Sequence, residues 1–268
     1  MPLGAVPITL LLSSGALVGI TLGLIGGGGS ILAVPLLVYL VGVPSTHVAI
    51  GTAAVAVALN AASGLATHAK LGTVKWPCAL VFSAAGVLGA FAGASLGKQF
   101  GGTELLALFG LLMIGVGIYM LTVRPKVAGH DVRLTPESAR HLLPRLILFG
   151  AGVGLLSGFF GIGGGFLIVP GLVLATGMAL QNAIGTSLFA VTTFGAATAA
   201  SYAVSGLVDW RIALLVIAGG VAGTLLGARA NVFLAGHKRA LVGTFASIVI
   251  VVGLYIIASG LATFLPQG

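Results

Sequence analysis

The chain has 268 residues, of which 58% are hydrophobic, and its formal charge of +8 comes from 12 Lys or Arg against 4 Asp or Glu. Charged residues make up 6% of the chain, whereas about one quarter is usual in a soluble domain, and the mean hydropathy is +1.21. This composition excludes a cytosolic enzyme and a disordered chain. The few cations form no basic stripe, so a nucleic-acid-binding protein is excluded as well.

Ten apolar segments follow one another along the chain, and the charged residues lie between or beside them. No Lys, Arg, Asp or Glu occurs before Lys70 or between Arg145 and Asp209. Charge-free apolar runs longer than about 18 residues indicate membrane-spanning helices, because backbone polar groups in lipid must be hydrogen-bonded within the segment. The segments are 6–25, 31–41, 48–68, 76–97, 104–123, 144–160, 166–176, 183–204, 210–233 and 239–264.

The second segment of each half is short, and a polar linker separates the halves. Segments 31–41 and 166–176 cannot cross a bilayer core of about 30 Å without tilt. We predict an all-α polytopic membrane protein that is held in the bilayer of the bacterial inner membrane. Its parts are a first transmembrane repeat at 1–123, a polar linker at 124–143, and a second transmembrane repeat at 144–268.

The two halves have related sequences. GLIGGGGSILAVP at 23–35 matches GFFGIGGGFLIVP at 158–170, and AIGT at 49–52 recurs at 183–186. We interpret these matches as a tandem duplication that gives two homologous repeats of 4–5 helical segments each, as in many transporters. Further matches in the same order pair Gly72 and Trp76 with Gly206 and Trp210, and Gly89-xxx-Gly93 with Gly223-xxx-Gly227.

The relative orientation of the repeats depends on what the glycine-rich stretches do. If residues 26–30 and 161–165, here called the glycine tracts, only kink a long helix, each half has four spans and the repeats are parallel. If each tract is a turn between two segments, each half has five segments and the repeats are inverted. The distribution of Lys and Arg between the two sides mildly favours inversion.

The glycine tracts are the strongest candidates for a binding site. A run of glycines should break a helix, since each costs about 1 kcal/mol relative to alanine, and irregular backbone at membrane depth persists where protein or a water-filled cavity satisfies it. Each tract precedes a short helix near the midplane, so free N–H groups could hold an anion. The alternative is a tight turn or a close-packing surface. The candidate residues are Gly26, Gly27, Gly28, Gly29, Ser30, Gly161, Gly163, Gly164 and Gly165.

Polar residues at the starts of two long helices add further candidates. Their hydroxyl groups could donate to an anion oxygen, or they could simply cap and bond back to the helix. Asn60 lies in the middle of a helix, where an amide either joins helices or lines a path. His47 and His68 bracket segment 48–68 and could meet an anion or stand at the two interfaces. The helix-start candidates are Gly51, Thr52, Gly185, Thr186 and Ser187.

Several signatures of other functions are missing from the sequence. Apart from Glu104, which begins segment 104–123, no acidic residue lies in a segment, and there is no HExxH, Walker A or GxSxG sequence. The single cysteine, Cys78, can form neither an intrachain disulfide nor a CxxC site. We therefore expect no enzyme activity, no cofactor, no metal site and no nucleotide-driven pumping.

The repeated order of glycine tract, proline, AxGT and G-x-V-x-W loop resembles the TauE/SafE family of sulfite exporters and related permeases for sulfur-containing anions. The resemblance covers nearly the whole chain outside the linker, and the second half fits best, with Gly185-Thr186-Ser187 and Gly206-Leu207-Val208-Asp209-Trp210. The first half departs from the pattern at Ala53 and Lys75, which makes the two half-sites unequal. Members of this family have seven or eight spans, a count that favours four per half.

The resemblance implies a secondary transporter of sulfite, sulfoacetate or a related organosulfonate, working by alternating access between the two repeats. The expected partners are a small anionic substrate and the lipid bilayer, and a homodimer is left open. The competing hypotheses are a passive channel for anions or small solutes and a non-transporting membrane scaffold subunit. A divalent-metal permease is disfavoured, because buried acids and clustered His or Cys are missing.

Overall fold

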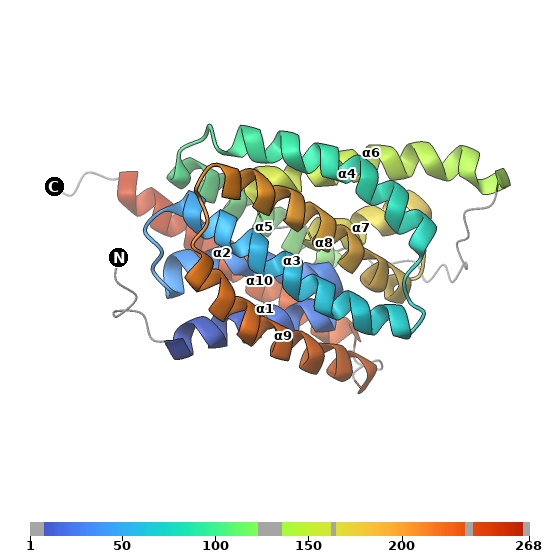
Figure 1. The fold of residues 1–268 in the computed structure, drawn as a ribbon, viewed down its shortest axis with the longest axis horizontal. Helices are drawn as coiled ribbons and strands as arrows, with labels where there is room; N and C mark the ends of the chain where they lie inside the picture. The colour runs from blue at the N-terminus through green and yellow to red at the C-terminus, as the bar shows by residue number, and fades with distance from the viewer. Residues whose placement is uncertain (1–7, 123–135, 162–164, 234–237, 265–268) are drawn as a thin grey trace.

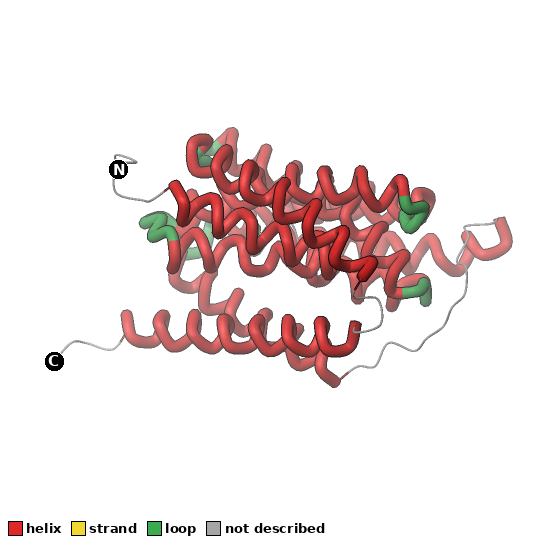
Figure 2. The backbone as a smooth tube through the Cα atoms, turned by 90° about the horizontal axis from the view of Figure 1, so that it is seen from below, coloured by secondary structure: helices red, strands yellow, loops and turns green. Residues whose placement is uncertain are grey.

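The computed structural model describes residues 8–122, 136–161, 165–233 and 238–264, and these are almost entirely helical (Figure 1, Figure 2). Eight helical stretches in these ranges are long and apolar enough to cross a membrane. The protein is therefore an all-α polytopic membrane protein. The elements are α1 (Ile8–Ile25), a 3₁₀ stretch (Gly26–Leu32), α2 (Ala33–Pro35), a π stretch (Leu36–Leu40), α3 (Thr46–Lys70), α4 (Trp76–Gly97), α5 (Gly102–Thr122), α6 (Pro136–Phe160), α7 (Gly165–Thr176), α8 (Leu180–Val204), α9 (Trp210–Phe233) and α10 (Lys238–Phe264).

The boundaries of the long helices lie close to those predicted from the sequence. Segments 76–97 and 210–233 coincide with α4 and α9. The linker prediction differs, because α6 begins at Pro136 and so includes the last part of 124–143. Proline suits the first turn of a helix, where its missing N–H has no partner to lose. Residues 123–135 lie outside the described ranges.

The first glycine tract folds into a 3₁₀ helix and turns the chain back on itself. Gly26 has a φ of +72°, which ends α1. A methyl group added at Gly29 would collide with the backbone of Thr21 and Leu22 in α1, so the segment after the turn lies against α1. The first tract therefore has regular 3₁₀ backbone geometry. The short segment that follows changes from 3₁₀ to α and then to π geometry around Pro35.

Helices α3 and α8, whose sequences match at AIGT, run in opposite directions. The start of α3 lies against the loop after α8, where Thr52 Oγ1 accepts a 3.0 Å hydrogen bond from the Asp209 N–H. The start of α8 lies against the loop after α3, where Thr186 Oγ1 accepts a 3.0 Å bond from the Lys75 N–H. The start of α1 and the end of α10 lie at the same end of the bundle (Figure 1). For this pair of helices, the antiparallel course agrees with the inverted alternative.

Rows of glycine let two pairs of helices pack backbone to backbone. Methyl groups added at Gly89 and Gly93 of α4 would collide with carbonyl oxygens of α6, and the same holds for Gly223 and Gly227 of α9 against α1. Both GxxxG motifs therefore serve close packing. In each pair one helix comes from each half of the chain, so the two halves are interlocked.

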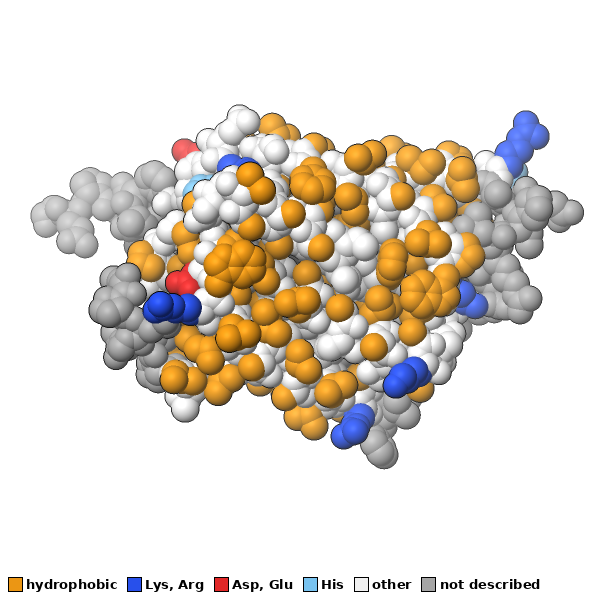
Figure 3. Space-filling model, in the orientation of Figure 1, with side chains coloured by type: hydrophobic (Ala, Val, Ile, Leu, Met, Phe, Trp, Pro, Cys, Tyr) orange, Lys and Arg blue, Asp and Glu red, His pale blue; other side chains and the backbone are white. Residues whose placement is uncertain are grey.

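The surface shows where the bilayer contacts the protein. On the face drawn in Figure 3, Lys, Arg, Asp and Glu gather at the two ends of the bundle, and a broad belt of hydrophobic side chains lies between them. Large apolar residues in the described ranges point outward within this belt, among them Leu88, Leu148 and Leu214. Such a surface is stable only in contact with lipid or another apolar partner.

Candidate functional site

The two glycine tracts cross inside the protein and touch each other. A methyl group added at Gly27 would lie 2.5 Å from Gly165 O, so only glycine allows this approach. The Gly27 N–H donates to Ser187 Oγ, and the Gly165 N–H donates to Ser30 Oγ, both at 3.2 Å and both buried. Each bond joins one half of the chain to the other.

Each serine hydroxyl at this crossing donates one hydrogen bond and accepts another. Ser30 Oγ donates to Gly27 O at 3.0 Å, and Ser187 Oγ donates to Ile184 O at 2.7 Å. Each serine thus links an amide N–H to a carbonyl oxygen through one hydroxyl. The arrangement satisfies buried backbone groups, and it brings together two hydroxyls and two amides from three segments, namely the 3₁₀ stretch, α7 and α8.

Glycine is required on either side of the crossing as well. Gly26 and Gly161 have φ values of +72° and +67°, a region that other residues rarely adopt. Methyl groups added to them would meet Ile184 and Ile50, respectively, so each turn packs against the AIGT sequence of the other half.

The helix-start candidates lie where loops meet helices. The hydroxyl oxygens of Thr52 and Thr186 accept the loop N–H groups described above. Gly51 and Gly185 lie beside them, and a methyl group on either would collide with the opposing loop, at Leu207 O and Thr73 Oγ1, respectively. These four residues hold the two loops against the opposite half.

Asn60 is the most unusual buried residue of the set. Its side chain is fully buried, and neither amide atom has a hydrogen-bond partner among the described residues. It packs against Gly220 of α9. The matched position in the second half is Phe194, which packs against Gly86 and stacks on Phe82 at 6.0 Å. One half therefore carries an unpaired amide where the other carries an aromatic stack.

The structure thus gathers some of the predicted residues and separates others. Gly27, Ser30, Gly165 and Ser187 meet at the crossing, flanked by Gly26 and Gly161. Gly29 instead faces α1, and Gly28 lies near Ile25 and Phe245 of α10. Gly163 and Gly164 lie outside the described residues.

Two further polar side chains are buried at the ends of the central helices. His68, 4% exposed, ends α3, and Tyr202, fully buried, ends α8. His68 Nε2 and the Tyr202 hydroxyl have no hydrogen-bond partner among the described residues. Sequence reasoning missed Tyr202, although the shift of 134 residues that aligns the AIGT sequences also aligns it with His68.

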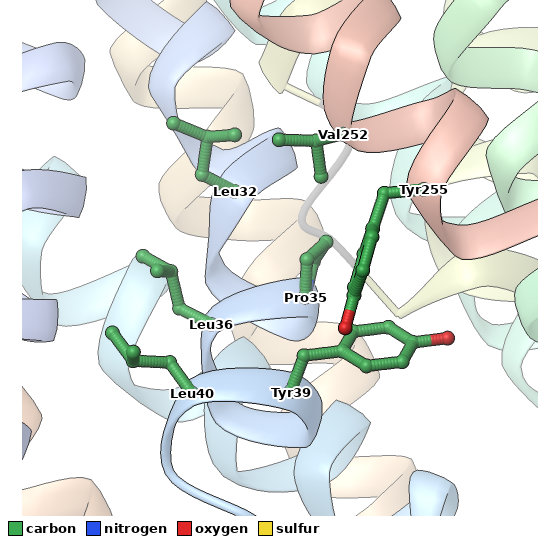
Figure 4. Close-up of a pocket in the computed structure, with 7 residues that line it drawn as sticks. All are labelled: Leu32, Pro35, Leu36, Tyr39, Leu40, Val252 and Tyr255. Atoms are coloured by element: carbon green, nitrogen blue, oxygen red, sulfur yellow. The ribbon is translucent and has the colours of Figure 1, made fainter. Parts of the chain in front are cut away.

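A separate apolar cavity of about 210 Å³ lies between the short segment after the first tract and α10 (Figure 4). Tyr39 and Tyr255 meet edge to face across it, with ring centroids 5.3 Å apart. Because Leu40 and Tyr255 are about half exposed, the cavity borders the lipid-facing surface. Its lining is apolar apart from the two tyrosine hydroxyls. Its lining residues are Leu32, Pro35, Leu36, Tyr39, Leu40, Val252 and Tyr255.

The glycine turns and the loop contacts occur in both halves of the chain. The match to a known family also covers both halves. Residues 11–256 match the family model described as sulfite exporter TauE/SafE. The chain belongs to the TauE/SafE family. It is therefore a membrane transporter, and the resemblance drawn from the glycine tracts and AIGT sequences is confirmed.

Curated relatives of this TauE/SafE protein carry the same general description. A "probable membrane transporter protein" of Xylella fastidiosa strain 9a5c is 49% identical over 251 residues, which cover 92% of this chain and 93% of the relative. The Bacillus subtilis protein YunE, also a "probable membrane transporter protein", is 30% identical and covers 83% of this chain and 88% of its own. YdhB of Bacillus subtilis is 27% identical over 80% of this chain and 86% of its own. No solved structure matches this chain.

Proposed function

We propose that this protein is a secondary transporter of a small sulfur-containing anion, such as sulfite or an organosulfonate, in the bacterial inner membrane. The binding site is the crossing of the glycine tracts. The family supports transport and a sulfur oxyanion as the substrate class. The crossing supplies the chemistry, because it combines two buried amide N–H groups with two hydroxyls.

The observation that carries this proposal is the pair of amides held by serine hydroxyls across the two halves. A hydroxyl oxygen that accepts from Gly27 N–H or Gly165 N–H occupies the position that an anion oxygen would take. Gly165 is also the first residue of α7, where the positive end of the helix dipole favours negative charge. An anion would displace the hydroxyls, which can then rotate and donate to it.

The crossing is closed in this structure, because Gly27 and Gly165 are in backbone contact. Binding therefore requires the tracts to separate, which is the movement expected of a carrier with alternating access. The expected movement is between the two repeats. The close packing of α9 on α1 and of α4 on α6 supports a variant of this proposal in which each mixed pair moves as one unit.

The test is sulfite flux into proteoliposomes that contain the purified protein. Ser30→Ala and Ser187→Ala should each lower the flux, because each removes a hydroxyl donor from the crossing. Ser247→Ala is the matched control, since this exposed serine of α10 bonds back to Gly243 O. Equal flux in all three variants and the wild-type protein would contradict the site assignment.

The same vesicles separate the carrier from its rivals. A carrier that couples transport to protons accumulates sulfite uphill under an imposed pH gradient, whereas a passive channel only equilibrates it. A scaffold subunit shows no flux and no saturable thermal stabilisation by sulfite.

A further inference from the structure

We propose that His68 Nε2, in the last turn of α3, is a proton-binding site, and that an anion binds there together with a proton. This inference rests on the proposed function and adds a coupling ion to it. It starts from the hydrogen bonds of one residue pair, His68 and Thr73.

The hydrogen bonds of Thr73 indicate one tautomer of His68. Thr73 Oγ1 lies 3.1 Å from His68 O, and because a carbonyl oxygen can only accept, the hydroxyl proton points to it. The same Oγ1 lies 3.0 Å from His68 Nδ1. With its proton already used, the hydroxyl can only accept this second bond, so Nδ1 carries a hydrogen. In the neutral ring Nε2 is then an unprotonated base.

This base is buried and has no hydrogen-bond partner among the described residues. His68 is 4% exposed, and the free position is Nε2. A buried lone pair without a donor is costly, so the site is better satisfied when Nε2 binds a proton and donates it to an oxygen of a bound anion. Protonation without an anion would leave an unpaired charge in a poorly hydrated position.

In the part of the chain that the structure describes, no carboxylate that could replace the anion lies on the elements around the His68 end. Among the described residues of α3 and of the elements packed on it, the acids are Glu104 and Asp209, at the start of α5 and in the loop after α8. Both lie at the opposite end, beside Thr46 and Thr52. The charged and titratable groups of these elements are Tyr39, His47, Lys70, Lys75, Cys78, Glu104, Tyr119, Tyr202, Asp209, Arg211 and Arg229.

The end of the bundle where α3 ends, near His68, is therefore cationic. Lys70 and Lys75 flank the loop that contacts α8, and Arg229 lies towards the same end of α9. A protonated histidine in such a neighbourhood is stabilised by a bound anion, which makes proton binding and anion binding mutually favourable.

The matched position at the other end cannot do the same. Tyr202 replaces His68 there, Leu207 replaces Thr73, and Lys98 Nζ lies 5.7 Å from the tyrosine ring while donating to Ser201 and Ser205. A phenol hydroxyl can donate to an anion without taking up a proton near neutral pH. The other end has a histidine of its own, because His47 lies beside Tyr202 with ring centroids 6.4 Å apart, and its Nδ1 also has no hydrogen-bond partner among the described residues. The inference here concerns the His68 site alone.

The first test is the tautomer itself, read from ¹⁵N-histidine NMR of the full chain in nanodiscs. His68→Gln identifies the His68 signals among the five histidines. Without an anion, we expect neutral His68 with hydrogen on Nδ1. Added sulfite should convert it to the doubly protonated ring at about pH 7.5, where an ordinary histidine is mostly neutral. A neutral ring protonated on Nε2, or a ring that stays neutral with saturating sulfite, overturns the inference.

The second test is the pH dependence of sulfite flux in proteoliposomes at about pH 5.5 and about pH 7.5. One titrating group changes flux by up to about tenfold per pH unit above its pKa, and His68→Gln should lose this part of the dependence. His141→Gln, an exposed position on α6, is the matched control and should keep it. Normal flux with an unchanged pH profile in His68→Gln overturns the inference but leaves the proposed function standing. No wild-type flux at either pH contradicts the proposed function itself.

Discussion

Replacing Gly27 with alanine would place a methyl group 2.5 Å from Gly165 O and 2.6 Å from Gly165 Cα. Ordinary contacts begin at 3.4 Å, so the two glycine tracts would have to separate by about 1 Å. The colliding atoms belong to backbone on both sides, and no side chain can rotate away to relieve the contact.

The cost of this separation follows from the bonds at the crossing. The bond from the Gly165 N–H to Ser30 Oγ joins the two tracts at 3.2 Å, and a further 1 Å takes it beyond hydrogen-bonding distance. Overpacking costs about 1–3 kcal/mol, and an unpaired buried N–H costs about 1–3 kcal/mol. We expect Gly27→Ala to lose on the order of 3 kcal/mol of stability and to lower sulfite flux, because the crossing can no longer close.

The assay is denaturant or thermal unfolding of the purified protein in one detergent, followed by flux measurements in proteoliposomes. Gly152→Ala on α6 is the matched control, since nothing lies within 4 Å of the added methyl group. That variant should be unchanged, or more stable by up to about 1 kcal/mol, because alanine favours helix. If the two variants unfold alike and both transport sulfite normally, the close crossing is refuted.

Thr52→Val and Thr186→Val should each destabilise the protein by about 1–2 kcal/mol, because each leaves a loop N–H without its acceptor. The double variant should lose the sum, since the sites lie at opposite ends of the bundle; a strongly non-additive melting result would contradict the separate placement. Asn60→Leu should raise the melting temperature by removing an unpaired buried amide, yet lower sulfite flux if the amide contacts the anion. Unchanged flux in that variant would remove Asn60 from the candidate site. Tyr202→Phe should raise the melting temperature for the same reason and keep the pH profile of flux, and a lost pH profile would argue against His68 as the titrating group.

Much of the architecture could be predicted because the bilayer imposes simple rules. Apolar runs without charge have to form helices, so segments 76–97 and 210–233 coincide with α4 and α9. The GxxxG motifs predicted close packing, yet their partners could not be predicted. Spacing shows that a helix has a smooth face, but it does not show which helix will lie on it.

The site could be predicted only in outline for the same reason. The glycine tracts were recognised because runs of four and of three adjacent glycines are costly in a helix. The sequence could not show that Ser30 and Ser187 would hold the amides of the opposite tract segments, since these contacts join residues 135 and 160 positions apart. Nor could it show that the hydroxyl oxygens of Thr52 and Thr186 would accept hydrogen bonds from loop N–H groups of the opposite half.

The sequence by itself determined that this protein is helical, lies in a membrane, is built from two related halves and carries no charge along its glycine-rich stretches. These properties follow from composition and from local backbone preferences, which act on neighbouring residues. Only the tertiary structure decided that the matching helices run antiparallel, that the tracts cross at Gly27 and Gly165, and that His68 has an unpaired nitrogen. These features depend on contacts between distant segments, where packing and hydrogen-bond geometry select one arrangement among many with the same local structure.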